Sequence, residues 1–219
     1  MAILEADRKA IGVLGGMFDP VHFGHLRPML EVKQALSLQN LRMVPCAIPP
    51  HRAAANVSAA QRVEMLRLAI EGEEGVVIDE REIQRETPSY SYDTLASLRE
   101  EFVEAPLCLI VGMDAFKGLP VWYRWQELLS LCHLVVMTRP GSRLDGGEEL
   151  QGYVNQHQTG SVDDLHSQLF GKIYFCEVTS LDISSTKIRT FLQQGESVRY
   201  LMPENVRAYI QEYQLYCCL

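Results

Sequence analysis

The sequence predicts a single α/β domain, built on a doubly wound parallel sheet with helices on both faces. Short apolar runs rich in β-branched residues recur along the 219 residues, and amphipathic stretches fill the gaps between them. Continuous apolar runs of this kind are typical of strands buried on both faces. The steady alternation of strand and helix favours a Rossmann-like sheet, in which ligands bind at the carboxyl ends of the strands where the strand order reverses.

The predicted strands share short length and apolar character, and they cover residues 10–16, 41–46, 75–79, 107–112, 134–138 and 172–178. The predicted helices alternate with them, at residues 23–38, 58–71, 91–103, 124–132, 185–194 and 203–216. In the second of these helices, Ser58 and Gln61 have the spacing of a capping box. Val63 and Leu66 belong to its apolar stripe. The last helix opens with Pro203, a residue favoured in a first helical turn.

One stretch, residues 141–170, interrupts this alternation. It is polar and rich in glycine, which predicts an insertion or long surface loop with at most short helices. Residues 180–219 are expected to form a C-terminal helical part of the same unit. Residues 1–219 are therefore expected to form one domain.

Composition limits the classes of function. The net charge of −8 predicts no general attraction to nucleic acid or to anionic membranes, so any positive charge for binding phosphates must be concentrated locally. No apolar run approaches the roughly 18 residues that a membrane span needs, and no signal peptide is expected. The six cysteines include no CxxC pair, which argues against a zinc ribbon or a redox pair. We expect a cytoplasmic protein with reduced thiols, and a homo-oligomer is compatible with the sequence.

The segment "GGMFDPVHFGH", residues 15–25, has the composition of a phosphate site. Gly15 and Gly16 end the first predicted strand, where the backbone can approach a ligand closely. His22 and His25 would share one face of the following helix's first turn, beside unpaired N–H groups and the positive end of the helix dipole. A lone histidine would more often be structural, but this pair favours phosphate binding. Zinc is a rival interpretation that lacks a third ligand of suitable spacing.

A second segment, "ISSTKIR", covers residues 183–189. Ser184 and Ser185 stand at a predicted helix start, where hydroxyl and N–H groups can cap the helix or bind phosphate. Lys187 and Arg189 add positive charge, and the planar fork of arginine suits phosphate oxygens. Taken alone, this segment would be explained by simple N-capping.

The two segments together resemble the signatures of the nucleotidyltransferase superfamily, GGxFDPxHxGH and ISSTxIR. The resemblance implies that His22 and His25 contact the triphosphate of ATP or CTP during nucleotidyl transfer. It implies that the second segment closes over the triphosphate, with Arg189 as a further catalytic residue. Met17 stands where relatives often carry Thr or Ser, so that only its backbone amide remains available for a contact.

Three middle segments extend the resemblance: "IPPHR" (48–52), "TPSYSYDTL" (87–95) and "VGMDAFKGLPVWYRWQELL" (111–129). With them, nearly the whole chain resembles the nicotinate-nucleotide adenylyltransferase family. The ATP-binding residues that the resemblance implies are Gly15, Gly16, Met17, Phe18, His22, His25, Gly112, Asp114, Ile183, Ser184, Ser185, Lys187 and Arg189. The implied substrate-binding residues are His51, Arg52, Thr87, Trp122 and Tyr123. One departure is Cys46 and Ala47, where many relatives have Asn-like residues.

The implied contacts agree with the chemistry of the substrate. The indole of Trp122 suits an electron-poor pyridinium ring, whereas core packing is the expectation for Trp125. Backbone N–H groups at Thr87 would select a carboxylate over a neutral amide. The remaining histidines, His133, His157 and His166, are expected to be structural or solvated.

The implied reaction joins ATP and nicotinate mononucleotide to give deamido-NAD and pyrophosphate. The attacking phosphate has a second pKa of about 6, so no general base is needed. His22, His25, Lys187, Arg189 and a Mg²⁺ ion would compensate the negative charge. The ion would be held mainly by phosphates and water, with no protein ligand set visible in the sequence.

Other readings remain open at this point. A sibling transferase would act on nicotinamide mononucleotide or on phosphopantetheine, and a non-catalytic nucleotide-binding protein belongs to another class. An NAD-dependent dehydrogenase is disfavoured because "GVLGGMF" lacks the GxGxxG pattern.

Overall fold

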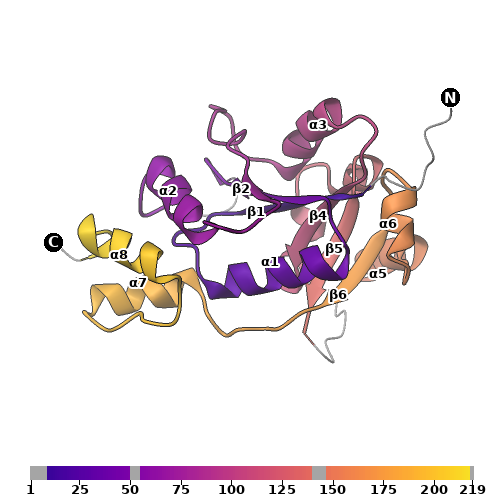
Figure 1. Ribbon diagram of the computed structural model, residues 1–219. Helices are drawn as coiled ribbons and strands as arrows, with labels where there is room; N and C mark the ends of the chain where they lie inside the picture. The colour runs from indigo at the N-terminus through magenta and orange to yellow at the C-terminus, as the bar shows by residue number, and fades with distance from the viewer. Residues whose placement is uncertain (1–8, 50–54, 140–146, 218–219) are drawn as a thin grey trace.

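The central sheet has six parallel strands, and it confirms the predicted fold class. The computed structural model describes residues 9–49, 55–139 and 147–217. The strands are β1 (Ile11–Gly16), β2 (Asn40–Pro45), β3 (Val76–Ile78), β4 (Leu107–Gly112), β5 (His133–Thr138) and β6 (Ile173–Glu177). They lie side by side in the order β3-β2-β1-β4-β5-β6, with every neighbouring pair parallel (Figure 1). Each strand agrees with its predicted range to within one residue at either end.

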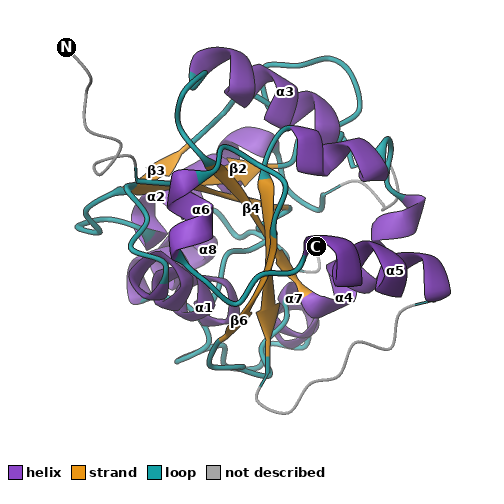
Figure 2. Cartoon of the chain, turned by 90° about the vertical axis from the view of Figure 1, so that its right-hand side faces the viewer, coloured by secondary structure: helices purple, strands orange, loops and turns teal. Residues whose placement is uncertain are grey.

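Two apolar cores cover the two faces of the sheet, because successive strand side chains point to opposite faces. In β4, Leu107 and Leu109 face one core while Cys108 and Ile110 face the other. One face is covered by α1 (Phe23–Ala35), α2 (Ala59–Ala69), α6 (Asp163–Ser167), α7 (Ser185–Gln193) and α8 (Glu204–Glu212). The other is covered by α3 (Ser91–Glu101), α4 (Met113–Lys117), α5 (Glu148–His157) and the 3-10 helices η2 (Leu119–Val121) and η3 (Trp125–Ser130). Figure 2 shows helices on both sides of the sheet.

The helix boundaries follow local signals. The predicted capping box opens α2: the Ser58 hydroxyl accepts from the Gln61 amide at 3.2 Å, and the Gln61 side chain accepts from the Ser58 amide at 3.0 Å. Pro203 is the N-cap of α8 rather than a residue of its first turn. The predicted helix at 124–132 forms the shorter 3-10 helix η3, which begins after Arg124 in the left-handed conformation.

The stretch 141–170, expected to be a polar insertion or surface loop with at most short helices, has two short helices over its described part, residues 147–170, but these helices pack into the core and do not form a surface loop. This part carries α5 and α6, and Leu150, Val154 and Leu165 are fully buried in the two cores. Because β5 and β6 are parallel, their connection must cross over one face of the sheet, and a helix does this efficiently. The few apolar residues and the interior Gly152 made the helical pattern weak in the sequence. Residues 141–146 lie outside the described residues.

The strand order reverses between β1 and β4, and this reversal places the candidate site. The register pairs Leu14 with Ile110, so the two strands reach the carboxyl edge of the sheet together with Gly16 and Gly112. After β6 the chain runs along α1 to α7 and then to α8, which packs beside α2 (Figure 1). This path returns the C-terminal part to the start of α1. In the described part of the chain, no helix is both long and apolar enough to cross a membrane.

Candidate active site

The two signature segments meet at the carboxyl end of β1. The Ser185 hydroxyl donates to the Pro20 carbonyl at 2.9 Å, although 165 residues separate them. The guanidinium of Arg189 donates from Nη1 to the Asp19 carbonyl at 2.6 Å. The sequence predicted that these segments share one site, and the fold brings them into direct contact.

His22 and His25 form a stacked pair of imidazoles at the start of α1. Their ring centroids are 3.8 Å apart with an interplanar angle of 27°, and the edge of Phe18 packs against His25 at 5.2 Å. His22 is the N-cap of α1 and is only 4% exposed. The Nδ1 atoms of both rings are buried and have no hydrogen-bond partner among the described residues. Buried polar atoms are rarely left unpaired, so the two unpaired Nδ1 atoms indicate a ligand-binding site.

Burial makes both imidazoles neutral in the unliganded protein. It lowers the pKa of His22 to about 4. It lowers the pKa of His25 to about 3, with a further contribution from the neighbouring His22. The expectation that these two side chains carry compensating positive charge therefore does not hold for the free protein, because desolvation disfavours the charged form. They remain suited to donate hydrogen bonds.

Gly24, which sequence reasoning did not single out, lets the two segments approach each other. A Cβ atom at this position would lie 2.9 Å from Nδ1 of His22 and 2.9 Å from the carbonyl oxygen of Ile183. At Gly15 and Gly112, by contrast, an added Cβ would meet nothing within 4 Å. At Gly16, the last residue of β1, an added Cβ would lie 2.9 Å from the Phe18 ring, so the backbone is open to an approaching ligand at Gly15 and Gly112 and not at Gly16.

Several helix-start amides are already hydrogen-bonded within the protein. In the first turn of α1 the Phe23 amide donates to the Leu201 carbonyl, and those of His25 and Leu26 donate to the His22 carbonyl. Among the described residues, this leaves Gly24 as the first-turn amide without a partner. In α7 the Ser184 hydroxyl accepts from the Lys187 amide at 3.2 Å, so Ser184 acts as the predicted N-cap.

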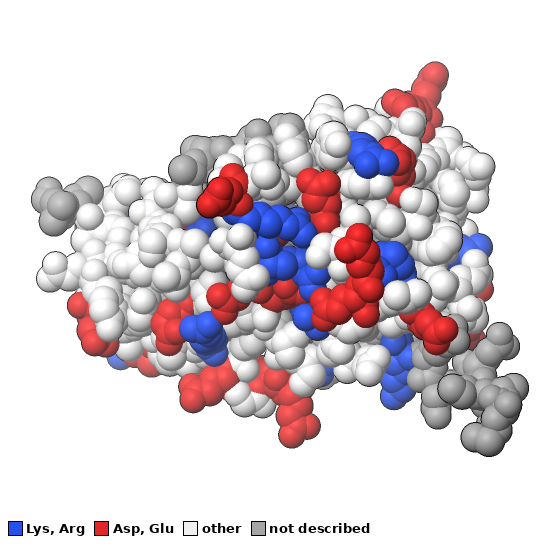
Figure 3. Space-filling model, turned by 90° about the horizontal axis from the view of Figure 1, so that it is seen from above, with Lys and Arg blue, Asp and Glu red and all other residues white. Residues whose placement is uncertain are grey.

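The charged groups around the site are unequal in exposure. The Lys187 ammonium is exposed and lies 3.3 Å from Asp182, whereas the Arg189 side chain is mostly buried. Arg62, which the sequence did not reveal, is fully buried on α2 and donates to the Met17 carbonyl at 2.9 Å. This hydrogen bond anchors the loop that follows β1 to α2. On the face that carries α3, acidic and basic side chains are interspersed (Figure 3).

Asp19 links the first signature segment to three other parts of the chain, which contain Asn56, Arg189 and Tyr216. Asp19 is 3% exposed, and its carboxylate accepts from the backbone and side-chain nitrogens of Asn56 at 2.9 and 3.0 Å. Its other oxygen accepts from the Tyr216 hydroxyl at 2.8 Å. The Arg189 guanidinium lies 3.8 Å from the carboxylate. Asn56 and Tyr216 could not be identified as partners from the sequence, because they come from distant segments that carry no motif.

The predicted substrate-binding segments lie next to each other. The Ser89 amide donates to the Ile48 carbonyl at 2.8 Å, and the Ser89 hydroxyl accepts from the amides of Ala47 and Ile48 at 3.1 and 3.3 Å. These bonds join the residues that follow β2 to the segment that contains Thr87. The Thr87 residue itself is exposed. Although Cys46 and Ala47 stand where many relatives have Asn-like residues, the Ala47 backbone amide still donates a hydrogen bond to Ser89. His51 and Arg52 lie outside the described residues.

The aromatic residues of the third segment divide between surface and core. Trp122 is half-buried, and the neighbouring Tyr123 is 48% exposed with its ring 4.7 Å from that of Tyr90. This contact joins the segments of Thr87 and Trp122. Trp125 is 8% exposed and packs edge-on against Tyr153, which confirms its predicted core role. Asp114 follows Gly112 in the first turn of α4 and is exposed.

The remaining histidines are structural, as expected. His133 is fully buried and lies 2.8 Å from the Gln168 carbonyl. His166 accepts from the Ala10 amide at 3.0 Å, and Nδ1 of His157 lies 3.0 Å from the Gly171 carbonyl.

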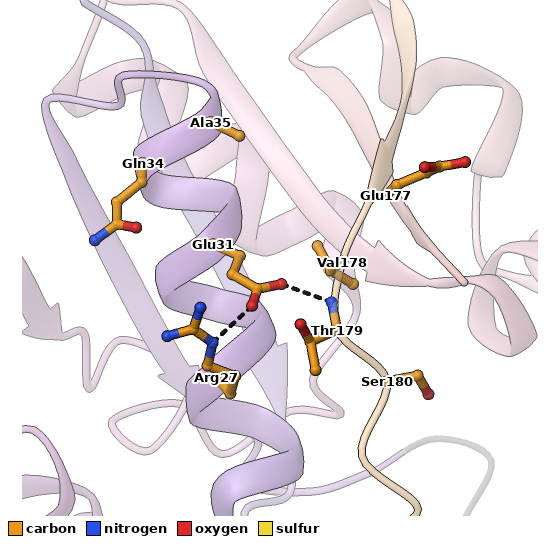
Figure 4. Close-up of a pocket in the computed structure, with 8 residues that line it drawn as sticks. All are labelled: Arg27, Glu31, Gln34, Ala35, Glu177, Val178, Thr179 and Ser180. Carbon is orange, nitrogen blue, oxygen red and sulfur yellow. Dashed lines mark hydrogen bonds and ion pairs between the residues drawn. The ribbon is translucent and has the colours of Figure 1, made fainter. Parts of the chain in front are cut away.

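Two hollows lie outside the contact between the two signature segments. A groove of about 640 Å³ separates α1 from residues 177–180, where Glu31 accepts from the Thr179 amide at 2.6 Å (Figure 4). A hollow of about 320 Å³ lies at the ends of β4, β5 and β6 and is lined in part by Met113, Thr138 and Phe175. Within the described ranges, no group of three or more His, Cys, Asp or Glu side chains could hold a metal ion.

Comparisons with known proteins agree with this geometry. A family model described as Cytidylyltransferase-like matches residues 13–191. A relative from Psychromonas ingrahamii named "Probable nicotinate-nucleotide adenylyltransferase" is 46% identical over 213 residues, covering 97% of this chain and 100% of the relative. A relative of the same name from Aeromonas hydrophila is 47% identical over 209 residues, covering 95% and 98%.

A solved structure shares the fold. Plasmodium falciparum nicotinic acid mononucleotide adenylyltransferase complexed with NaAD matches with a TM-score of 0.74 and 18% identity, covering 95% of this chain and 97% of that one. The same protein complexed with APC gives a TM-score of 0.71.

The sheet order and the paired segments at the reversal point define the class of this protein, a Rossmann-like nucleotidyltransferase. Its sequence similarity to relatives extends over almost the full length of both chains. The chain belongs to the nicotinate-nucleotide adenylyltransferase family within the cytidylyltransferase-like proteins.

Proposed function

We propose that the chain transfers the adenylyl group of ATP to nicotinate mononucleotide, giving deamido-NAD and pyrophosphate in NAD biosynthesis. The observation that carries the proposal is the contact between the two signature segments at the end of β1, in a chain that matches relatives of this activity almost end to end. The absence of disulfides among the described cysteines supports a cytoplasmic enzyme.

The reaction is an in-line displacement at the α-phosphorus of ATP. The phosphate of the mononucleotide attacks, a new P–O bond forms, and the bond to the β-phosphate oxygen breaks to release pyrophosphate. Because that phosphate has a pKa of about 6, it is mostly a dianion at neutral pH and no proton has to be removed. His22 and His25 then act as neutral hydrogen-bond donors to phosphate oxygens, which agrees with their lowered pKa values.

The main barrier is the repulsion between two polyanions, which is costly where water is excluded. Arg189 and Lys187 reduce it directly, and the open backbone at Gly15 lets the phosphates approach the end of β1. We propose that Mg²⁺ enters with ATP and is held by phosphates and water, since the described side chains offer it no cage. The ion would supply further charge neutralisation. Catalysis is therefore positioning and electrostatic stabilisation.

The acceptor site lies beside the segments of Thr87 and Trp122. We propose that the Trp122 indole stacks on the pyridine ring, with Tyr123 beside it, and that backbone N–H groups near Thr87 bind the nicotinate carboxylate. We further propose that His51 and Arg52 bind the phosphate of the mononucleotide.

One assay tests this function. The pure protein is incubated with ATP and Mg²⁺, and nicotinate mononucleotide, nicotinamide mononucleotide and phosphopantetheine are offered separately while pyrophosphate release is measured. We expect the highest turnover with nicotinate mononucleotide. Highest turnover with phosphopantetheine would contradict the assignment, and equal turnover on both pyridine nucleotides would contradict the proposed selectivity.

A further inference from the structure

We propose that Tyr216, at the C-terminal end of the described chain, is a positioning residue for the ATP site. Its hydroxyl holds the Asp19 carboxylate in place and thereby leaves the Arg189 guanidinium available for the triphosphate. The inference rests on the proposed function, because it assigns Arg189 to ATP.

Tyr216 is well placed for this task. It lies beyond α8 with its side chain buried in the core, and it is 9% exposed. Its hydroxyl donates to Oδ1 of Asp19 at 2.8 Å, a contact across 197 residues of sequence. This buried hydrogen bond therefore links the residues that follow α8 to the loop of the first signature.

The Asp19 carboxylate needs its donors because it is almost completely buried. Asn56 provides two hydrogen bonds to Oδ2, and Tyr216 provides the bond to Oδ1. With these bonds in place, the nearest Arg189 nitrogen remains 3.8 Å from the carboxylate, longer than a direct charged hydrogen bond. Hydrogen bonds from neutral donors thus satisfy the carboxylate without engaging the arginine.

Arg189 is only partly committed in this arrangement. One nitrogen donates to the Asp19 carbonyl at 2.6 Å, and the other lies 3.3 Å from the Thr186 hydroxyl. A guanidinium has five N–H donors, so others remain to bind phosphate oxygens. Without the Tyr216 hydroxyl, Oδ1 of the buried carboxylate would lose its donor, and the carboxylate could then turn towards its cationic neighbours, Arg62 and Arg189, the second of which lies 3.8 Å from Oδ2. A shift of about 1 Å would close the ion pair and draw the guanidinium away from ATP.

The Tyr216→Phe variant tests this idea because it removes only the hydroxyl. We expect KM for ATP to rise about ten-fold, which is the lower end of the effect of losing a hydrogen bond to a charged group. KM for nicotinate mononucleotide should be unchanged. Binding of a non-hydrolysable ATP analogue, measured by calorimetry, should weaken by the same factor.

Tyr213→Phe is the matched control. Tyr213 follows α8, is 55% exposed, and packs its ring on Tyr209 at 4.6 Å. This variant should keep wild-type kinetics. Asn56→Ala, which removes one donor from the other carboxylate oxygen, should weaken ATP analogue binding in the same direction as Tyr216→Phe.

The outcomes separate the two proposals. If Tyr216→Phe lowers the melting temperature but leaves KM for ATP and analogue binding at wild-type values, the tyrosine is merely structural and the inference is wrong. An equal rise in both KM values would also overturn it. If the wild-type protein binds the analogue but forms no deamido-NAD, the proposed function fails, while the analogue binding of Tyr216→Phe still decides the inference.

Discussion

Replacing Gly24 by alanine tests whether the two signature segments must touch. Gly24 lies in the first turn of α1, and an added Cβ would lie 2.9 Å from both the Nδ1 atom of His22 and the carbonyl oxygen of Ile183. Ordinary contacts begin near 3.4 Å, so these groups must retreat by about half an ångström. The carbonyl belongs to the backbone and cannot move without moving the second segment.

Two opposing effects set the magnitude for Gly24→Ala. Alanine is favoured over glycine inside a helix by about 1 kcal/mol, whereas overpacking costs about 1–3 kcal/mol. We expect a net loss of stability of about 1 kcal/mol. Since a displacement of about 1 Å can cost a hundred-fold in rate, a displacement of half that size should lower kcat about ten-fold.

The assay compares Gly24→Ala with Gly152→Ala, in thermal melts and in pyrophosphate release at saturating substrates. Gly152 lies inside α5, where an added Cβ meets nothing within 4 Å. The Gly152→Ala variant should gain about 0.5–1 kcal/mol of stability and keep its kcat. If Gly24→Ala behaves like Gly152→Ala in both measurements, the close contact between the segments has no role.

Three further predictions concern single residues. Replacing His22 or His25 by alanine should lower kcat about a hundred-fold through loss of a donor to the transition state, and near-normal kcat in both variants would remove them from the mechanism. Between pH 7 and pH 5 the unfolded chain binds protons that the buried His22 does not, so the stability of the fold decreases as the pH is lowered. His22 alone contributes about 2 kcal/mol to this loss at pH 5, and this part should disappear in His22→Asn melts, while the parts due to the buried His25 and His133 remain. An equal loss in that variant would contradict the pKa argument. Ser89→Ala removes the hydroxyl that accepts from the Ala47 and Ile48 amides and keeps the Ser89 amide bond to the Ile48 carbonyl, so KM for the mononucleotide should rise several-fold while KM for ATP stays constant. The reverse pattern would exclude this loop from the acceptor site.

The elements with strong local patterns were predictable from the sequence. The apolar run at residues 107–112 and the capping box of Ser58 and Gln61 gave correct positions, because both depend on neighbouring residues alone. The helix α5 was missed because its buried face consists mainly of Leu150 and Val154, too few for a clear period.

The candidate site was predictable in its motifs and not in its supporting contacts. His22, Ser185 and Arg189 were identified from their motifs, and the structure brings them together. The contacts of Arg62 and Tyr216 with the first segment depend on how α2 and the C-terminal end pack, which no local pattern encodes. The neutrality of the histidines depends on burial and is likewise a property of the folded chain.

A crystal structure with a non-hydrolysable ATP analogue tests the central claim most directly, namely that the starts of α1 and α7 form one triphosphate site. We predict that the triphosphate lies between them, within hydrogen-bonding distance of His22, His25 and Arg189. A triphosphate bound elsewhere, for example in the groove between α1 and residues 177–180, would contradict the account.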